Sequence, residues 1–125
     1  MIIIKHILLD LFIKNQEAEF NYNDIPGIIK NNNIIFEVNE DKYLVSKENS
    51  LSLKKENKES ILLFNFNINK KEKCTYYIKE MNLYLDCEVK ALEMINKDNK
   101  IYVKYILWLQ DELIGEYEIR IVIKK

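Results

Sequence analysis

The sequence predicts an all-β protein, a single antiparallel meander that closes into a barrel of about eight to ten strands. The first observation is that apolar and polar residues alternate with a period close to two through most of the chain, as half-buried strands require. The second is that polar clusters interrupt this alternation at a spacing of roughly ten residues, which is typical of barrels and sandwiches. We favour the barrel over the sandwich because closure removes exposed edge strands.

The N-terminal part of the chain supplies the first three expected strands. The first extends from about Ile2 to Lys14, and its stronger apolar face consists of Ile3, Ile7, Leu9, Leu11 and Ile13. The segment "EAEFNY" alternates in the same way, and "NIIFEV" comes after it. Between them, Pro26 and Gly27 in "DIPGI" indicate a turn or bend, with a short helix near residues 24–31 as the alternative.

The remaining strands follow as shorter runs and then longer ones. They are "KYLVS", "SLSLK", "ESILLFNFNI", "KCTYYIK", "NLYLDCEVKALEMI" and the two halves of the C-terminal segment, residues 101–125. The turns between them are rich in Asn, Asp, Glu and Lys, and Asn tolerates the left-handed conformation that a turn often needs. In the longest run the alternation slips between Ala91 and Leu92, which predicts a β-bulge or a break.

The residue pattern predicts the register of the last two strands. If Leu109 lies opposite Leu113, one face of the hairpin is wholly apolar. The cross-strand pairs on that face are Tyr105–Tyr117, Val103–Ile119 and Ile101–Ile121. The pairs on the other face are Lys104–Glu118, of opposite charge, and Tyr102–Arg120, a cation–π contact.

The preceding hairpin places the two cysteines side by side. A loop over residues 79–82 aligns Cys74 with Cys87 on the interior face and Lys73 with Glu88 on the solvent face. The thiols then form a disulfide or a redox pair, or they stay reduced as small buried apolar groups. A reducing cytoplasm favours the reduced thiols.

Composition excludes several classes of protein. The 125 residues fit one domain, residues 1–125, and they carry 19 basic and 20 acidic side chains, so no net field would attract nucleic acid. No apolar run reaches the length of a membrane span. Lys5, His6 and Asp10 interrupt an N-terminal apolar run that would otherwise suggest a signal peptide. We expect a cytoplasmic protein with no nucleic-acid or membrane partner.

Three segments resemble a known family, the small bacterial proteins related to YwiB. They are "EDKYLVSKE", "TYYIKEMNLYLDCEV" and the closing hairpin "IYVKYILWLQDELIGEYEIRIVI", within a likeness that covers roughly residues 34–125. The chain departs from the family in the turn over residues 79–82, where Asn82 stands in place of an expected Gly. The resemblance implies a calycin-like (lipocalin-like) β-barrel, a domain of unknown function with no established activity.

No combination of residues predicts catalysis. His6 and Asp10 share the weaker apolar face of the first strand, but they lie too far apart along an extended chain for direct contact. Asp86 and Glu88 are candidates for a paired acidic site, although nearby lysines make a surface ion network the simpler interpretation. Two cysteines and a single histidine without close spacing do not make a zinc site. We expect a non-catalytic protein without a metal or cofactor.

The tyrosines supply the best candidate for a binding site. Tyr76, Tyr105 and Tyr117 are predicted to face inward, where each phenol needs a hydrogen-bond partner. A narrow barrel is usually filled by its own side chains, so a filled interior is the simpler interpretation. In a calycin-like barrel, however, these tyrosines and their aliphatic neighbours would line a cavity. We therefore predict a protein that binds a small apolar or amphipathic ligand.

An apolar patch on the outer face supports an alternative function. Tyr102, Ile106 and Trp108 occupy positions that should face water. Such a patch fits a structural or protein-interaction module with a filled core, and a second copy of the chain is one candidate partner.

Overall fold

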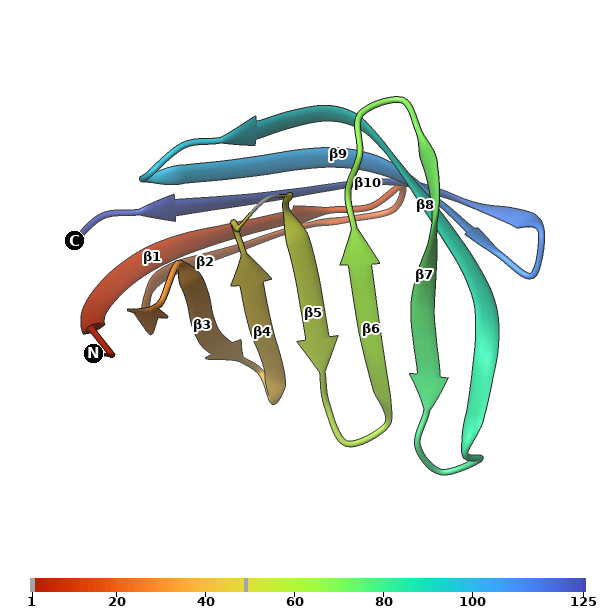
Figure 1. The fold of residues 1–125 in the computed structure, drawn as a ribbon, viewed down its shortest axis with the longest axis horizontal. Helices are drawn as coiled ribbons and strands as arrows, with labels where there is room; N and C mark the ends of the chain where they lie inside the picture. Colours follow the sequence, from red (N-terminus) through yellow and green to blue (C-terminus); the bar gives the residue numbers. More distant parts are fainter. Residues whose placement is uncertain (1, 49) are drawn as a thin grey trace.

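The described residues, 2–48 and 50–125 of a computed structural model, form ten strands and no helix. The strands are β1 (Ile4–Lys14), β2 (Glu19–Lys30), β3 (Asn33–Val38), β4 (Asp41–Ser46), β5 (Ser52–Glu56), β6 (Ser60–Asn65), β7 (Lys71–Ile78), β8 (Leu83–Asn96), β9 (Lys100–Leu109) and β10 (Glu112–Ile123). Each strand pairs antiparallel with the next, and β1 pairs with β10, so the sheet closes (Figure 1). The predicted all-β antiparallel barrel is confirmed.

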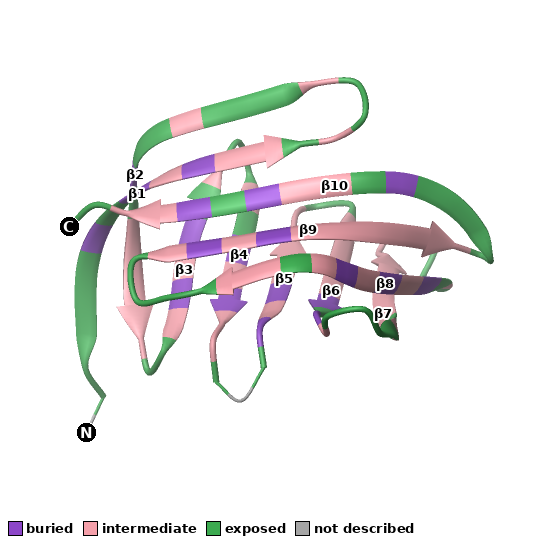
Figure 2. Ribbon diagram, turned by 90° about the horizontal axis from the view of Figure 1, so that it is seen from above, coloured by how far each residue is buried: buried purple, intermediate pink, exposed green. Residues whose placement is uncertain are grey.

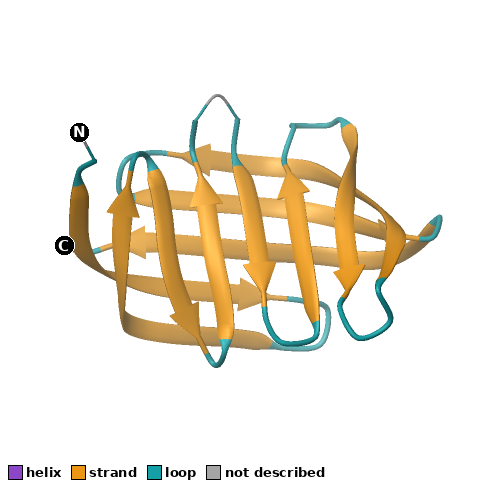
Figure 3. Cartoon of the chain, turned by 60° about the horizontal axis from the view of Figure 1, so that its bottom comes forward, coloured by secondary structure: helices purple, strands orange, loops and turns teal. Residues whose placement is uncertain are grey.

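The barrel is flattened into two layers that cross each other. In Figure 3, β3 to β7 lie side by side in front, and β1, β2, β8, β9 and β10 run across behind them. The two layers meet where β8 pairs with β7 and where β2 pairs with β3. The second junction is short, because only residues 27–30 of β2 pair with β3. The N-terminal half of β2 therefore pairs with β1 alone.

The hydrophobic core lies between the layers. Because side chains alternate in direction along a strand, every second residue points inward, and Figure 2 shows buried positions recurring along β9 and β10. The largest fully buried side chains are Phe66, Leu9, Leu11, Ile34, Leu51, Ile121, Val45, Val89 and Val103. Ile3 was predicted to belong to this face, but it is 69% exposed. The prediction is wrong because Ile3 precedes β1, and the pairing of β1 with β10 begins only at Leu9.

The segment "DIPGI" is neither a turn nor a helix, which corrects both expectations from the sequence. It continues β2 through a bulge opposite Leu9 and Leu11, where Asp24 has a φ of 55°. Pro26 fits here because its partner Leu8 directs its own backbone N–H and C=O toward residues 124 and 125. The missing N–H of Pro26 therefore costs no hydrogen bond between β1 and β2.

The other predicted features of the sheet are confirmed with one exception. A bulge lies between Ala91 and Glu93, and Cys74 pairs with Cys87 across the β7–β8 hairpin. Asn residues occupy turns with positive φ: Asn31, Asn32, Asn39 and Asn82. In the last hairpin the predicted register holds from Gly115 onward. At its tip, however, a third bulge places Glu112 opposite Leu109.

Candidate functional site

A cavity of about 370 Å³ lies inside the barrel, near the β1–β2 and β3–β4 turns. Eight of the strands contribute to it. The lining residues are Ile13, Asn15, Phe20, Tyr22, Val38, Asn39, Asp41, Tyr43, Leu53, Lys55, Leu62, Phe64, Tyr105, Leu107, Tyr117 and Ile119. The barrel is therefore not filled completely by its own side chains. The simpler interpretation of the sequence was a filled interior.

Aromatic rings form one wall of this cavity. The ring centroids of Tyr105 and Tyr117 are 5.5 Å apart, with their planes nearly parallel. Phe64 packs against Tyr105 at 5.6 Å, and Phe66 packs behind it at 5.2 Å. The aliphatic side chains around these rings complete an apolar surface, which suits the apolar part of a ligand.

The hydroxyl groups of Tyr105 and Tyr117 in the cavity wall are neutral and form no side-chain hydrogen bond with the described residues. Burial raises the pKa of Tyr105 above its usual value, and the neighbouring Tyr117 and Tyr43 raise it further. Burial also raises the pKa of Tyr117. Within the described residues, the tyrosine hydroxyls that form side-chain hydrogen bonds belong to Tyr22, Tyr77 and Tyr102. The hydroxyls of Tyr105 and Tyr117 therefore remain available to a guest molecule.

Two of the three predicted tyrosines line this cavity, and the third does not. Tyr76 packs against the core, opposite Leu62 and Leu85, but it is not among the cavity residues. Sequence reasoning missed Tyr22 and Tyr43, although both lie on the inward phase of their strands. The parity of Tyr43 with Val45 in "DKYLVS" was the signal that could have found it.

Charged and amide side chains form a polar end of the same cavity. Lys55 Nζ lies 3.6 Å from Asp41 Oδ2, and Asn57 Nδ2 donates a hydrogen bond of 2.9 Å to Asp41 Oδ1. Asn39 Nδ2 donates to the hydroxyl of Tyr22 at 3.3 Å. The cavity thus combines an apolar wall with a polar end, which is an arrangement suited to an amphipathic molecule.

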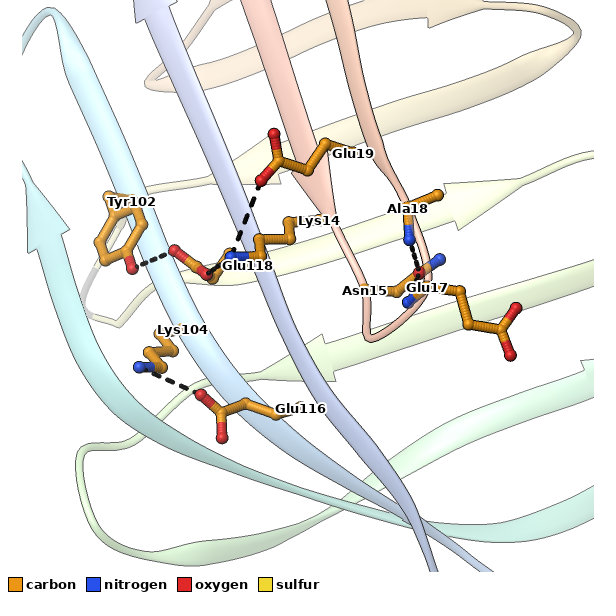
Figure 4. Close-up of polar contacts among 9 residues, drawn as sticks. All are labelled: Lys14, Asn15, Glu17, Ala18, Glu19, Tyr102, Lys104, Glu116 and Glu118. Atoms are coloured by element: carbon orange, nitrogen blue, oxygen red, sulfur yellow. Dashed lines mark hydrogen bonds and ion pairs between the residues drawn. The ribbon is translucent and has the colours of Figure 1, made fainter.

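The outer patch predicted from the sequence is interrupted by polar partners. The Tyr102 hydroxyl donates a 2.6 Å hydrogen bond to Glu118 Oε1 (Figure 4), and burial followed by this bond raises the pKa of Tyr102. Lys71 Nζ lies 4.3 Å from the ring centroid of Trp108. Ile106 is flanked by Lys90 on β8 and by a glutamate on β10.

Two expected side-chain contacts on this face take other partners. Lys104 is directly opposite Glu118, but it forms its ion pair diagonally with Glu116, at 3.1 Å (Figure 4). Arg120 is opposite Tyr102, but its guanidinium lies over the ring of Phe12 on β1, 4.7 Å from the centroid. The neighbouring strand thus competes for Arg120, which a hairpin considered by itself does not reveal.

The remaining candidates from the sequence do not assemble into a reactive site. Cys74 and Cys87 are joined by a disulfide rather than held as reduced thiols. Glu88 pairs with Lys71 at 3.6 Å, which agrees with a surface ion network, and His6 is exposed. Across residues 2–48 and 50–125, no group of three or more His, Cys, Asp or Glu side chains is arranged to hold a metal ion. No helix of these residues is long and apolar enough to cross a membrane.

Comparisons with known proteins give one family and one similar structure. A family model described as a domain of unknown function (DUF1934) matches residues 12–121. The chain is also similar to the crystal structure of the ywiB protein from Bacillus subtilis, with 7% sequence identity and a TM-score of 0.39. That match covers 99% of this chain and 94% of the other chain. No curated protein matches.

Proposed function

We propose that the barrel of this chain, which belongs to the DUF1934 family of domains of unknown function, binds a small amphipathic ligand without transforming it. The observation that carries the proposal is the cavity of about 370 Å³. Small-molecule sites typically measure roughly 300 to 1,000 Å³ and combine apolar walls with a few polar groups. The calycin-like barrel that the sequence resemblance implies would accommodate such a site.

The chemistry of the cavity favours binding over catalysis. The phenols of Tyr43, Tyr105 and Tyr117 have raised pKa values and stay protonated at neutral pH, so they act as hydrogen-bond donors and acceptors rather than as bases. The charged groups at its polar end, Lys55 and Asp41, lie beside each other. The proposal requires no cofactor, nucleic acid or membrane.

Filling the cavity should weaken ligand binding. Leu107 lines the cavity from β9, so Leu107→Trp is expected to weaken binding of the neutral apolar fluorophore N-phenyl-1-naphthylamine by roughly tenfold or more, since the indole occupies the space the probe needs. Fluorescence titration measures the affinity, and circular dichroism checks the fold.

The matched control for this variant is Ile106→Trp, one residue earlier on the same strand. Ile106 is not among the cavity residues and sits on the solvent face, between Lys90 and Glu116. The Ile106→Trp variant should therefore bind the fluorophore with the same affinity as the wild type. A folded Leu107→Trp protein that binds the fluorophore as well as the wild type does would contradict the proposal.

A second candidate function, self-association, is favoured by one observation. The bulge in β10 places Leu113 directly opposite Trp108, and Leu113 is 65% exposed. This leucine extends the apolar patch defined by Tyr102, Ile106 and Trp108 toward the tip of the hairpin. If the patch is an interface between two copies, the wild type should be a dimer.

The variants Trp108→Glu and Leu113→Glu should then be monomers, because a charge buried in an apolar interface is costly. Light scattering at several protein concentrations measures the mass of each. The control is Asn65→Glu, at an exposed position of β6, which should remain dimeric. A monomeric wild type would eliminate this candidate and leave ligand binding untouched.

A further inference from the structure

We infer that the ligand carries an anionic group, such as a carboxylate, which binds to the ammonium of Lys55 while the apolar part of the ligand lies against the aromatic wall. This inference rests on the proposed ligand-binding function and adds the chemical class of the ligand. It depends on where Lys55 points, on how many hydrogen bonds Lys55 and Asp41 already form, and on the other charges in the cavity.

Lys55 points into the barrel because of its position in the alternation of β5. Leu53, two residues earlier, is buried in the core, and both residues line the cavity. Lys54 and Glu56 lie on the other face of the strand and form an ion pair there, at 3.6 Å. The side chain of Lys55 is 36% exposed, so its ammonium lies at the open, polar end of the cavity, where a ligand can reach it.

Asp41, the partner that the chain provides for Lys55, satisfies only part of the hydrogen-bonding capacity of the ammonium. Lys55 Nζ lies 3.6 Å from Asp41 Oδ2, which is close enough for an ion pair but too long for a hydrogen bond. Its other contact is with the face of Tyr43, at 5.9 Å from the ring centroid. By contrast, Lys79 Nζ donates a hydrogen bond of 2.8 Å to Glu56 on the outer surface. The three donors of the Lys55 ammonium are therefore largely unused by the described residues.

The carboxylate of the pair is better satisfied than the ammonium. Asp41 Oδ1 accepts a hydrogen bond of 2.9 Å from Asn57, in addition to the ion pair that its other oxygen forms with Lys55. A cationic ligand would have to compete with both. An anionic ligand would instead find the Lys55 donors free, so the charge that the cavity offers to a guest is positive.

Apart from Asp41, no charged side chain among the described lining residues opposes an anion. Among the described lining residues, Lys55 and Asp41 are the charged side chains, and the rest of the polar surface comes from phenols and amides. The phenols of Tyr105 and Tyr117 stay neutral, so they add donors without adding negative charge. The arrangement fits a molecule with one anionic end and an apolar body.

The test compares two probes with the same hydrocarbon chain, decanoate and 1-decanol, by isothermal titration calorimetry at pH 7.5 below the micelle concentration. The wild type should bind decanoate at least roughly tenfold more tightly than decanol, as a charge-assisted hydrogen bond implies. Lys55→Met should lower the affinity for decanoate by roughly tenfold or more and leave that for decanol nearly unchanged. Asp41→Asn should strengthen decanoate binding, because it removes the competing carboxylate.

The matched control is Lys54→Met, which removes the same charge one residue away on the outer face and should change neither affinity. Equal binding of the two probes by the wild type, or a Lys55→Met protein that still prefers decanoate, would overturn the inference while the ligand-binding function stands. Binding of neither probe would count against the inference and the proposed function together. Because the wild-type comparison needs no variant, the inference remains testable even if Lys55→Met does not fold.

Discussion

Replacing Phe66 with alanine is expected to lower the free energy of unfolding by about 3–5 kcal/mol. Phe66 is 1% exposed and is the largest fully buried side chain. Its ring centroid lies 5.9 Å from that of Phe64 and 5.2 Å from that of Tyr105. The loss combines the apolar surface that the ring buries with the space left behind, which a closed sheet cannot collapse to fill.

Urea denaturation followed by circular dichroism measures this change. The matched control is Phe20→Ala, because Phe20 is 44% exposed and its truncation should cost well under half as much. A loss below about 1 kcal/mol for Phe66→Ala would mean that the interior repacks around the missing ring and that the observed core is not rigid. The same variant should also loosen the wall of the cavity, since the ring of Tyr105 packs directly against Phe66.

Removing the disulfide should have the second-largest effect on stability. Cys74 and Cys87 are joined across the β7–β8 hairpin with a sequence separation of 13 residues. Opening a loop of this length restores conformational freedom to the unfolded chain, and the free energy of unfolding should fall by about 2–3 kcal/mol. The double variant Cys74→Ala, Cys87→Ala or the addition of dithiothreitol should each give this loss in urea denaturation.

A control separates the bond from the side effects of the reagent. Dithiothreitol should leave the stability of the double alanine variant unchanged, and mass spectrometry should confirm that the wild-type thiols are free after treatment. If fully reduced wild-type protein unfolds at the same urea concentration as oxidised protein does, the bond contributes nothing to stability. The register of β7 and β8 would then rest on its other cross-strand pairs alone, including Tyr76 with Leu85 and Ile78 with Leu83.

The sequence predicted the fold well because alternation is a strong constraint on a sheet with one apolar face. A one-residue slip moves every apolar side chain to the other face, so the pairing of Cys74 with Cys87 and of Tyr105 with Tyr117 followed from pattern alone. The slip at Ala91 was visible for the same reason. The family model, which matches residues 12–121, confirms that the chain belongs to a family of domains of unknown function.

The bulges that sequence reasoning missed left no mark in that pattern. At the tip of β10, Leu113 and Ile114 are both apolar, so an extra residue between Leu113 and Gly115 does not disturb the alternation. In β2, Pro26 and Gly27 usually end a strand, but here the proline faces away from the ladder with β1. In both places, the deciding information lies in the neighbouring strand.

The candidate site was predicted only in part, because it depends on which strands meet. Tyr105 and Tyr117 are cross-strand partners on adjacent strands and could be placed together from one hairpin. Lys55 and Asp41 lie on adjacent strands as well, but in the sequence Lys55 belongs to a lysine-rich run that resembles a solvated surface. The parity of Lys55 with Leu53 was the signal that separates it from Lys54.

The short junction between β2 and β3 gives the closed barrel a weak corner. Backbone pairing between these strands covers residues 27–30, whereas the part of β2 that borders the cavity is bonded to β1 alone. Across that stretch, the side chains of Asn39 and Tyr22 form a single hydrogen bond. Separating β2 from the β3–β4 turn therefore breaks no main-chain hydrogen bond between β2 and β3. A local separation at this corner would therefore leave the ladder of ten strands intact.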